Sequence, residues 1–378
     1  MYEPKFRITP RLLNLISQID QLKEQIIQAP VVPAYENKIK KDALVRMVHY
    51  GTRIEGNRLS ELEAKRVIEG GEVVGFERDV QEVLNYRRVV EFIDRLTTPP
   101  GEKPRLETDF EVKVPVKVEW QEKELVYNEE MIKKINQITT DNLVNASISG
   151  EYRKEKVVIE NLSTGEVVFK PPSAVEVPFL VRDLLEYLNS QKARELHPVV
   201  RAAIAHYFLV AIHPFVEGNG RTARAFALVI LFAEGYDVKG LFSLEEYFYQ
   251  HLPEYYSALV RVSNSATELS KRDLSSWIEF YAQAMATELN RLKIRIEEIA
   301  QLVPKIKVKS GKQIEISQRQ MVLLNFFKYG DKLKMAQARL LLPDVSDDTI
   351  LRELQDLQKK GLIVKKGRTK GSYYEMVR

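Results

Sequence analysis

Residues 213–224 constrain the fold more than any other segment, because they follow an apolar helical stretch, residues 198–212, without a linker. The segment is His-Pro-Phe-Val-Glu-Gly-Asn-Gly-Arg-Thr-Ala-Arg. Its Gly-Asn-Gly run can adopt positive φ and point consecutive backbone N–H groups at one place, which makes an anion-binding nest. If a helix begins there, its N-terminal N–H groups and its dipole add to the same attraction.

The side chains of this segment indicate a site for an oligophosphate. Arg221 and Arg224, three residues apart, would share a helix face and bind phosphate oxygens bidentately. Glu217 offers a hard oxygen ligand for Mg²⁺, and His213 is a candidate proton acceptor at neutral pH. Taken singly, each residue has a structural explanation as a satisfied histidine, a turn or a solvated arginine. Together and in this order, they predict phosphate chemistry.

Composition places the chain among ordinary proteins without an obvious membrane segment. Its 378 residues are enough for two or three domains, each with its own core. The absence of cysteine excludes disulfides and thiolate metal sites, and a net charge of +4 is too small to indicate nucleic-acid binding by the whole molecule. The first residues form no apolar signal segment, and no run of about 18 apolar residues occurs, so we expect a cytoplasmic protein that does not enter a membrane.

Residues 213–224 match the pattern HPFx[DE]GNGRxxR at every fixed position and so resemble Fic (filamentation-induced-by-cAMP) domains. The resemblance implies transfer of AMP from ATP to a Ser, Thr or Tyr hydroxyl of a protein, with release of pyrophosphate. It implies that His213 deprotonates the hydroxyl, that Glu217 holds Mg²⁺ between the α- and β-phosphates, and that Arg224 reaches the γ-phosphate. The residues that would cradle the other phosphates are Gly218, Asn219, Gly220 and Arg221.

Residues 50–57, Tyr-Gly-Thr-Arg-Ile-Glu-Gly-Asn, resemble the inhibitory motif [ST]xxxE[GN] of Fic proteins. By that resemblance Glu55 would pair with Arg224 and exclude the γ-phosphate, and the chain would belong to the class whose inhibitory helix precedes the Fic core. The Ser/Thr position is occupied by Gly51, with Thr52 one place later, which leaves the hydroxyl anchor of the motif in doubt. The structural alternative is that residues 55–57 form only a turn between two helices.

Residues 150–169 predict a β-hairpin, because two runs of β-branched and aromatic residues flank the turn at residues 161–165. Fic proteins carry such a hairpin, the flap, which positions the target protein by adding a strand to it. A plain surface hairpin is the alternative. Residues 103–126 predict a second, inserted hairpin, with a strand-like stretch at residues 110–118, and we assign it no role.

Residues 247–259 include Tyr249, Tyr255 and Tyr256. Fic proteins often have Asn-Arg-x-x-Tyr-Tyr here, contacting the nucleoside; this chain matches the two tyrosines but has His251 in place of the asparagine. Core packing explains the tyrosines as well as adenine stacking does. The histidines at 49, 197 and 206 are predicted to be structural.

Helical periodicity dominates the rest of the chain. It predicts helices at residues 12–27, 41–49, 59–68, 80–96, 128–143, 177–189, 198–212, 226–234 and 274–299. The predicted fold class is therefore mainly α. The resemblance to Fic domains implies a Fic-type helical bundle with a β-hairpin flap, and the C-terminal pattern resembles a small winged-helix domain. The predicted domains are an N-terminal helical region (1–127), a Fic core (128–300) and a winged helix-turn-helix domain (301–378).

The C-terminal region resembles a winged helix-turn-helix domain by its pattern of three helices, at 317–327, 335–341 and 347–360, followed by a hairpin. Its third helix contains Arg352 but also acidic residues, which repel phosphate: Asp347, Asp348, Glu353 and Asp356. The wing is basic, with Lys365, Lys366, Arg368 and Lys370. DNA binding and protein contacts both remain open. Homodimers are common among proteins that resemble this chain, and no apolar stripe in the sequence decides the oligomeric state.

Three functions follow for this sequence. The favoured one is a protein adenylyltransferase restrained by Glu55. The second is an enzyme of the same fold with another specificity, which transfers a phosphoryl group or another nucleotide, or removes AMP from a modified protein. The third is a DNA-binding regulator that senses nucleotide through its Fic core, and His213 and Glu217 argue against it, because a sensor needs neither a base nor its spacing from the arginines.

Overall fold

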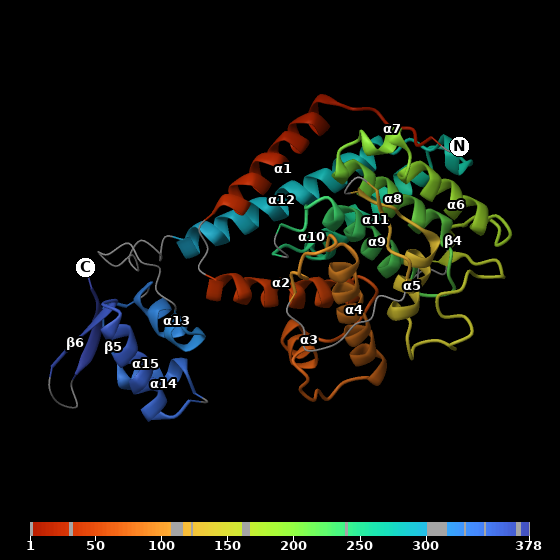
Figure 1. Cartoon of the computed structure of the whole chain (residues 1–378). Helices are drawn as coiled ribbons and strands as arrows, with labels where there is room; N and C mark the ends of the chain where they lie inside the picture. The colour runs from red at the N-terminus through yellow and green to blue at the C-terminus, as the bar shows by residue number, and fades with distance from the viewer. Residues whose placement is uncertain are drawn as a thin grey trace. The chain divides into compact units, whose positions relative to one another are not determined.

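The chain divides into two units. Two buried helices, α8 (Pro198–Ile212) and α9 (Asn219–Ala233), lie at the centre of the larger one (Figure 1). α8 is apolar all round, as expected of a helix that other helices surround. Pro198 occupies a first-turn position, where its missing N–H costs no hydrogen bond, and this explains why the predicted start was correct. Arg201 near the start of α8 pairs with Glu234 just after α9 at 2.7 Å, so the two helices run antiparallel.

The structure is a computed structural model that describes residues 3–29, 33–106, 116–121, 124–160, 167–238, 241–300, 316–328, 330–343, 345–367 and 372–377. The first of the two compact units comprises Met1–Ile27 and Lys40–Lys293, and the second comprises Gln28–Ile39 and Ile294–Arg378. The predicted N-terminal region and Fic core therefore both fall largely within the first unit.

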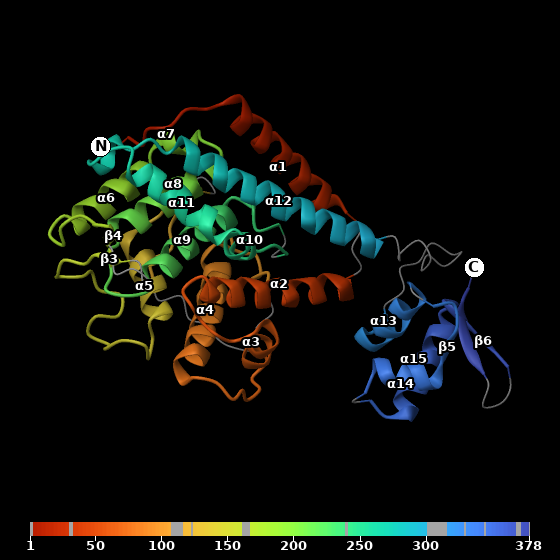
Figure 2. The same cartoon turned by 180° about the vertical axis from the view of Figure 1, so that it is seen from behind.

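The other helices of the first unit surround the central pair (Figures 1 and 2). Most coincide with predicted helices, which confirms the mainly helical fold class. Lys5 and Arg7, just before α1, contact Leu274 and Ser275 at the start of α12, and the two helices lie side by side in both views. Their bounds are α1 (Pro10–Gln28), α2 (Pro33–Arg53), α3 (Glu61–Ile68), α4 (Glu77–Leu96), α5 (Glu129–Thr139), α6 (Val177–Leu188), α7 (Gln191–Arg194), α10 (Leu244–Gln250), α11 (Leu252–Ser263), η2 (Leu269–Lys271) and α12 (Ser275–Ala300). Of these, α1, α2 and α12 also include residues that are assigned to the second unit.

Residues 247–259, for which the sequence analysis predicted no element, belong to two helices that meet at His251. Ser243 caps the first of these helices. Pro253 lies in the first turn of α11, where a proline is tolerated, whereas inside a continuous helix it would remove a hydrogen bond and clash with the preceding turn. The imidazole of His251 stacks on the ring of Tyr247 at the junction, with ring centroids 4.1 Å apart.

Two short hairpins belong to the first unit. The strands β3 (Ile159–Glu160) and β4 (Val167–Phe169) pair antiparallel, as predicted for residues 150–169, while the turn at residues 161–166 lies outside the described residues. In the inserted segment, β1 (Trp120–Gln121) pairs with β2 (Glu124–Leu125). Most of the strand expected at residues 110–118 lies outside the described residues, and residues 116–118 are not in a strand.

The second unit has several helices and a three-stranded sheet, which share one hydrophobic core. Its helices are α13 (Gln318–Asn325), η3 (Phe326–Lys328), α14 (Met335–Leu341) and α15 (Asp347–Lys359). Its strands are β5 (Leu333–Lys334), β6 (Ile363–Lys366) and β7 (Tyr373–Met376), which form an antiparallel sheet in the order β5-β7-β6. Leu354, Leu357 and Ile363 are among the buried side chains that join α15 to the sheet. The sequence prediction missed β5, which has only two residues.

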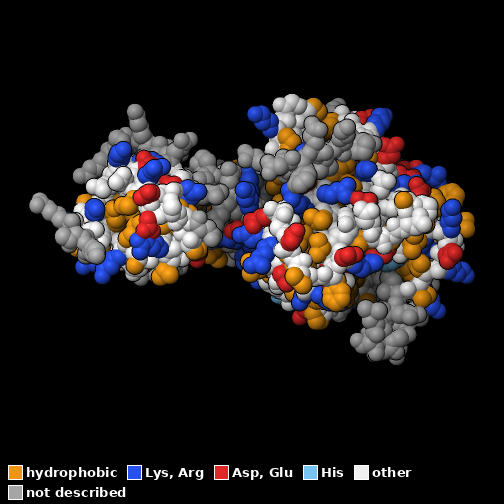
Figure 3. All heavy atoms as spheres, turned by 90° about the horizontal axis from the view of Figure 1, so that it is seen from below, with side chains coloured by type: hydrophobic (Ala, Val, Ile, Leu, Met, Phe, Trp, Pro, Cys, Tyr) orange, Lys and Arg blue, Asp and Glu red, His pale blue; other side chains and the backbone are white. Residues whose placement is uncertain are grey.

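Acidic and basic side chains are interspersed over the face of the molecule that Figure 3 shows. No helix in the described part of the chain combines the length and the apolar character that a membrane crossing requires.

Candidate active site

The turn between α8 and α9 is held in shape by Asn219. Its side-chain amide accepts a hydrogen bond from the backbone N–H of Phe215 and donates one to the carbonyl of Phe215, each at 2.9 Å. Gly218 precedes α9 with φ of +76°, and a β-carbon there would lie 2.9 Å from the methyl group of Thr140. The turn therefore requires glycine for both its backbone conformation and its close packing. The helix begins at Asn219, so its first N–H groups point into the site.

Asn136 on α5 ties this turn to two other segments. Its amide nitrogen donates to the carbonyl of Glu217 at 2.9 Å and to the hydroxyl of Thr222 at 3.2 Å. Its amide oxygen accepts from the N–H of Gly150 at 3.1 Å, and the residue is 1% exposed. Asn136 thus fixes the metal-ligand candidate Glu217 and the start of the flap segment together.

His213 ends α8 in the left-handed conformation, with φ of +52°. Burial lowers the pKa of His213 to about 4, and the positive charge of Arg153 acts in the same direction. The carbonyl of Val210 and the charge of Glu55 act in the opposite direction but do not outweigh burial. The imidazole is therefore neutral at pH 7 and able to accept a proton. Its Nδ1 atom is buried without a hydrogen-bond partner among the described residues.

The carboxylate of Glu55 lies at the start of α9 and contacts Arg224. Arg224 donates a hydrogen bond to Glu55 Oε1 at 2.9 Å, and its side chain is 2% exposed against 31% for that of Glu55. Burial would raise the pKa of Glu55, but the charges of Arg224 and Arg221 outweigh this effect and the pKa lies below its usual range. A β-carbon on Gly220 would overlap with Glu55 Oε1, so this glycine admits the carboxylate to the helix N-terminus. An anion of the protein itself thus occupies the predicted phosphate position.

The segment with Glu55 is anchored without the hydroxyl of the inhibitory motif. A β-carbon on Gly51 would overlap with the ring of Tyr86 on α4, so no larger residue fits there. The carbonyl of Gly51 instead accepts a hydrogen bond from Arg224 at 2.9 Å. The hydroxyl of Thr52 donates within its own helix, to the carbonyls of Val48 and His49, and therefore does not replace the missing anchor.

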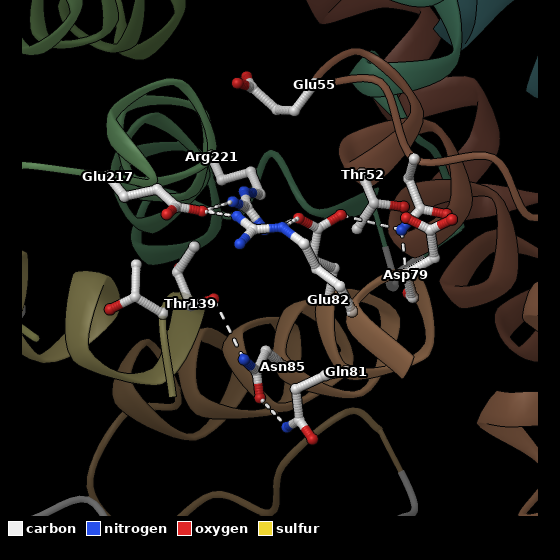
Figure 4. A network of polar contacts seen from close by, with 12 residues as sticks. Thr52, Glu55, Asp79, Gln81, Glu82, Asn85, Thr139, Glu217 and Arg221 are labelled. Carbon is white, nitrogen blue, oxygen red and sulfur yellow. Dashed lines mark hydrogen bonds and ion pairs between the residues drawn. The ribbon is translucent and has the colours of Figure 1, made fainter. Parts of the chain in front are cut away.

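Arg221 lies between two carboxylates, as Figure 4 shows. Its guanidinium is 3.6 Å from Glu82 on α4 and 3.5 Å from Glu217, and the side chain is 3% exposed. Both contacts are long, and Nε and Nη1 of Arg221 are buried with no hydrogen-bond partner in the described part of the chain. Glu217 also pairs with Arg78, whose Nε is 3.4 Å from Glu82. Buried donors without acceptors are costly, so Arg221 is suited to a further anion.

The two tyrosines proposed for the nucleoside differ in exposure. Tyr255 is 2% exposed and shares a hydrogen bond of 3.0 Å with His206, which lies among aromatic rings. Tyr256 is 46% exposed, and its hydroxyl donates to the carbonyl of Ile54 at 3.4 Å. Tyr255 is thus held in the core, and Tyr256 offers a surface beside the segment that carries Glu55.

Several residues that shape the site were not identified from the sequence: Arg78, Glu82, Tyr86, Asn136 and Arg153. The contacts cited for these residues join positions that are 60 or more residues apart in the chain. No local motif marks such residues, because their partners are brought together only by the packing of α4, α5 and the flap segment on α8 and α9.

A family model described as Fic/DOC family matches residues 126–231. Residues 126–231 form a Fic/DOC domain. The protein adenylyltransferase Fic of Drosophila mojavensis is 41% identical over 87 residues, and that of Drosophila virilis is 42% identical over the same length. Each alignment covers 23% of this chain and 16% of the relative, so the chain spans about a sixth of the length of the curated relatives it matches.

Solved structures show the same fold over more of the chain. A Fic family protein from Desulfovibrio desulfuricans G20 aligns with a TM-score of 0.64 at 22% identity, and the alignment covers 100% of this chain and 98% of that one. Fic-1 from C. elegans aligns with a TM-score of 0.57 at 20% identity, covering 76% and 73% of the two chains. The fold around the Fic/DOC domain is thus that of Fic proteins.

The contacts of Asn136 predict that Asn136→Ala destabilises the first unit by about 3 kcal/mol, because buried groups of Glu217 and Gly150 lose their partners. Both tryptophans, Trp120 and Trp277, lie in this unit, so urea unfolding followed by tryptophan fluorescence measures its stability. Lys134→Ala on the same helix removes only an exposed hydrogen bond and should change stability by less than about 0.5 kcal/mol. Equal unfolding midpoints for the two variants would contradict the role of Asn136.

Proposed function

We propose that this chain is a protein adenylyltransferase, which transfers AMP from ATP to a Ser, Thr or Tyr hydroxyl of a protein and is restrained by Glu55. The observation that carries the proposal is the contact of Glu55 with Arg224 at the N-terminus of α9, beside a histidine with a lowered pKa. A carboxylate held there by a guanidinium and a helix terminus marks an anion site. The names of the curated relatives support AMP transfer as the reaction.

The proposed reaction uses His213 as the general base. A nitrogen of the imidazole takes the proton of the target hydroxyl as its oxygen bonds to the α-phosphorus of ATP. The bond from that phosphorus to the bridging oxygen breaks, and pyrophosphate leaves with the electron pair. Arg221, Arg224 and the N–H groups of residues 218–220 neutralise the charge that grows on the leaving group. Tyr256, which is half exposed, is the better placed of the two tyrosines to contact the base.

Magnesium fits this site through one protein ligand, Glu217. Mg²⁺ typically binds one or two carboxylates, with phosphate oxygens and water completing its coordination. The described residues contain no cluster of three His, Asp or Glu that would bind a metal alone, and the side chain of Glu217 is 30% exposed. Bound Mg²⁺ would neutralise the phosphates. Arg78 contacts only one oxygen of this carboxylate, Oε1, and would compete with a bound ion for its charge.

The flap is the proposed contact for the target protein. The pairing of β3 with β4 leaves a strand edge to which an extended target segment can add. Arg153, at the base of the same segment, hydrogen-bonds to the carbonyl of His213 at 2.8 Å, so the flap begins beside the proposed base. This arrangement would bring a hydroxyl on the added strand toward the imidazole.

Removal of the inhibitory carboxylate is predicted to activate the protein. Glu55→Gly should tighten Mg²⁺-ATP binding by about 10- to 100-fold, because a charge-assisted hydrogen bond of roughly 1.5–3 kcal/mol no longer competes with the γ-phosphate. Auto-modification with α-³²P-ATP should rise accordingly and disappear in Glu55→Gly, His213→Ala. Glu72→Gly, an exposed glutamate on a nearby loop, serves as the matched control.

Two results of this experiment would decide between the functions. Label transferred from γ-³²P-ATP but not from α-³²P-ATP would exclude AMP transfer and favour a kinase-like specificity. An unchanged rate and ATP affinity in Glu55→Gly would contradict the restraint while leaving the reaction class intact.

The lowered pKa of His213 predicts that activity persists in mild acid. The base is active when deprotonated, so a pKa of about 4 keeps it active as the pH falls from 7 to 5, below the ordinary histidine value. In Glu55→Gly the pKa should be lower still, because Glu55 raises it. The acid limb of kcat/KM against pH, measured while tryptophan fluorescence confirms that the protein is folded, should lie below pH 5. An acid limb near pH 6.5 would show that another group or another environment controls the rate.

We further propose that the second unit is a winged helix-turn-helix domain that does not bind DNA through α15. Asp347 pairs with Arg339 at 2.7 Å, and Asp348 beside it is exposed, so the start of this helix is negative. Lys365 and Lys366 on β6 are exposed cations, whereas Arg368 and Lys370 lie outside the described residues. We expect duplex DNA to be retarded in a gel only at low salt, since about two phosphate contacts give a weak, salt-sensitive complex. A sequence-selective complex that survives 0.15 M salt, about physiological ionic strength, would contradict this.

A further inference from the structure

Arg153 is a buried cation whose partners are main-chain carbonyls. Its side chain donates to the carbonyls of His213 (2.8 Å), Pro172 (2.6 Å), Glu155 (3.0 Å) and Ile212 (3.4 Å). The residue is 3% exposed and has no carboxylate partner among the described residues. A buried guanidinium is costly unless its donors are satisfied, so the four carbonyls must hold a defined geometry around it.

These carbonyls belong to both ends of the flap and to the end of α8. Glu155 precedes β3, Pro172 follows β4, and Ile212 and His213 close α8. The backbone N–H of Arg153 also donates to the carbonyl of Pro214 at 2.9 Å. The planar fork of an arginine can bind several acceptors in fixed directions at once, whereas the ammonium of a lysine is a single point charge on a flexible stem.

The contact also fits the local backbone of His213. A left-handed φ of +52° is uncommon for a residue other than glycine and persists only where its surroundings hold it. Arg153 binds the carbonyl of this residue and that of the preceding one, and a cation is stabilised at the C-terminal carbonyls of a helix. The backbone conformation of His213 is therefore held by a residue of the flap segment.

We propose that Arg153 is a positioning residue for the transfer reaction, which holds the flap and His213 in one register so that a hydroxyl on the target segment added to the flap meets the imidazole. The inference rests on the proposed function, since it assigns Arg153 to the same reaction. The side chain of Arg153 would have two roles. Its planar guanidinium fixes the positions of the four carbonyls, and its positive charge favours the neutral form of the His213 imidazole. Among charged groups, Arg153 and Glu55 act on His213 with opposite signs.

The experiment compares Arg153→Lys and Arg153→Gln in the full chain carrying Glu55→Gly. Single-turnover auto-modification with α-³²P-ATP should fall about 100-fold in both, because a displacement of the base by about 1 Å costs that much. Mg²⁺-ATP affinity should stay within about twofold, which a general loss of structure would not allow. The pH at which the rate falls on the acid side should be unchanged for Arg153→Lys, which keeps the positive charge. For Arg153→Gln, which loses it, this pH should be higher.

The matched control is Arg182→Gln, an exposed arginine on α6 that should leave both rate and affinity unchanged. If the Arg153 variants lose their cooperative unfolding, Pro172→Gly tests the same coupling, because it loosens one acceptor and leaves Arg153 intact. Its transfer rate should fall while ATP affinity holds.

The possible failures are distinguishable. Absence of AMP transfer in the Glu55→Gly parent would overturn the proposed function. Transfer by the parent that is undiminished in folded Arg153→Lys and Arg153→Gln, or in Pro172→Gly, would overturn only the positioning role. A parallel loss of ATP affinity and rate would assign Arg153 to general structure and would equally overturn it.

Discussion

The antiparallel packing of α8 on α9 is the constraint on which the site depends. Two buried helices are joined by the six residues from 213 to 218, so the chain must reverse within a turn that is itself largely buried. Positive φ at His213 and Gly218 and the reciprocal bonds of Asn219 with Phe215 accomplish this reversal. The imidazole, the carboxylate of Glu217 and the N-terminus of α9 are therefore close together as a result of the turn.

The same reversal places two helix ends of opposite polarity side by side. The C-terminal carbonyls of α8 carry partial negative charge, and the N-terminal N–H groups of α9 carry partial positive charge. Each end has a charged side chain of the opposite sign: Arg153 on the carbonyls and Glu55 at the N–H groups. The two side chains differ in exposure. Arg153 is buried and hydrogen-bonded to main-chain carbonyls, whereas the side chain of Glu55 lies on a turn and is 31% exposed.

The sequence predicted the parts of this arrangement that local chemistry determines. The bounds of α8 followed from Pro198 and the apolar run, and the start of α9 followed from Gly-Asn-Gly. The Glu55–Arg224 contact was predicted by resemblance, and the structure brings the two residues together. Asn136, Glu82 and Arg153 could not be predicted, because each binds groups far along the chain and none lies in a distinctive pattern. The two helices that meet at His251 were likewise not predicted, although Pro253 lies in the first turn of the second one, where a proline is tolerated.

At Gly51 the chain departs from the motif, and the packing around this residue explains the departure. A serine or threonine here would need the space that the ring of Tyr86 fills. Tyr86 donates a hydrogen bond to the buried Glu245 at 3.3 Å, which fixes the ring against the segment that carries Glu55. The bond that Arg224 makes here is to the carbonyl of Gly51, a group that every residue possesses. The Glu55 segment is therefore held by the backbone path of α2 and by Tyr86, with no hydroxyl at the first position of the motif.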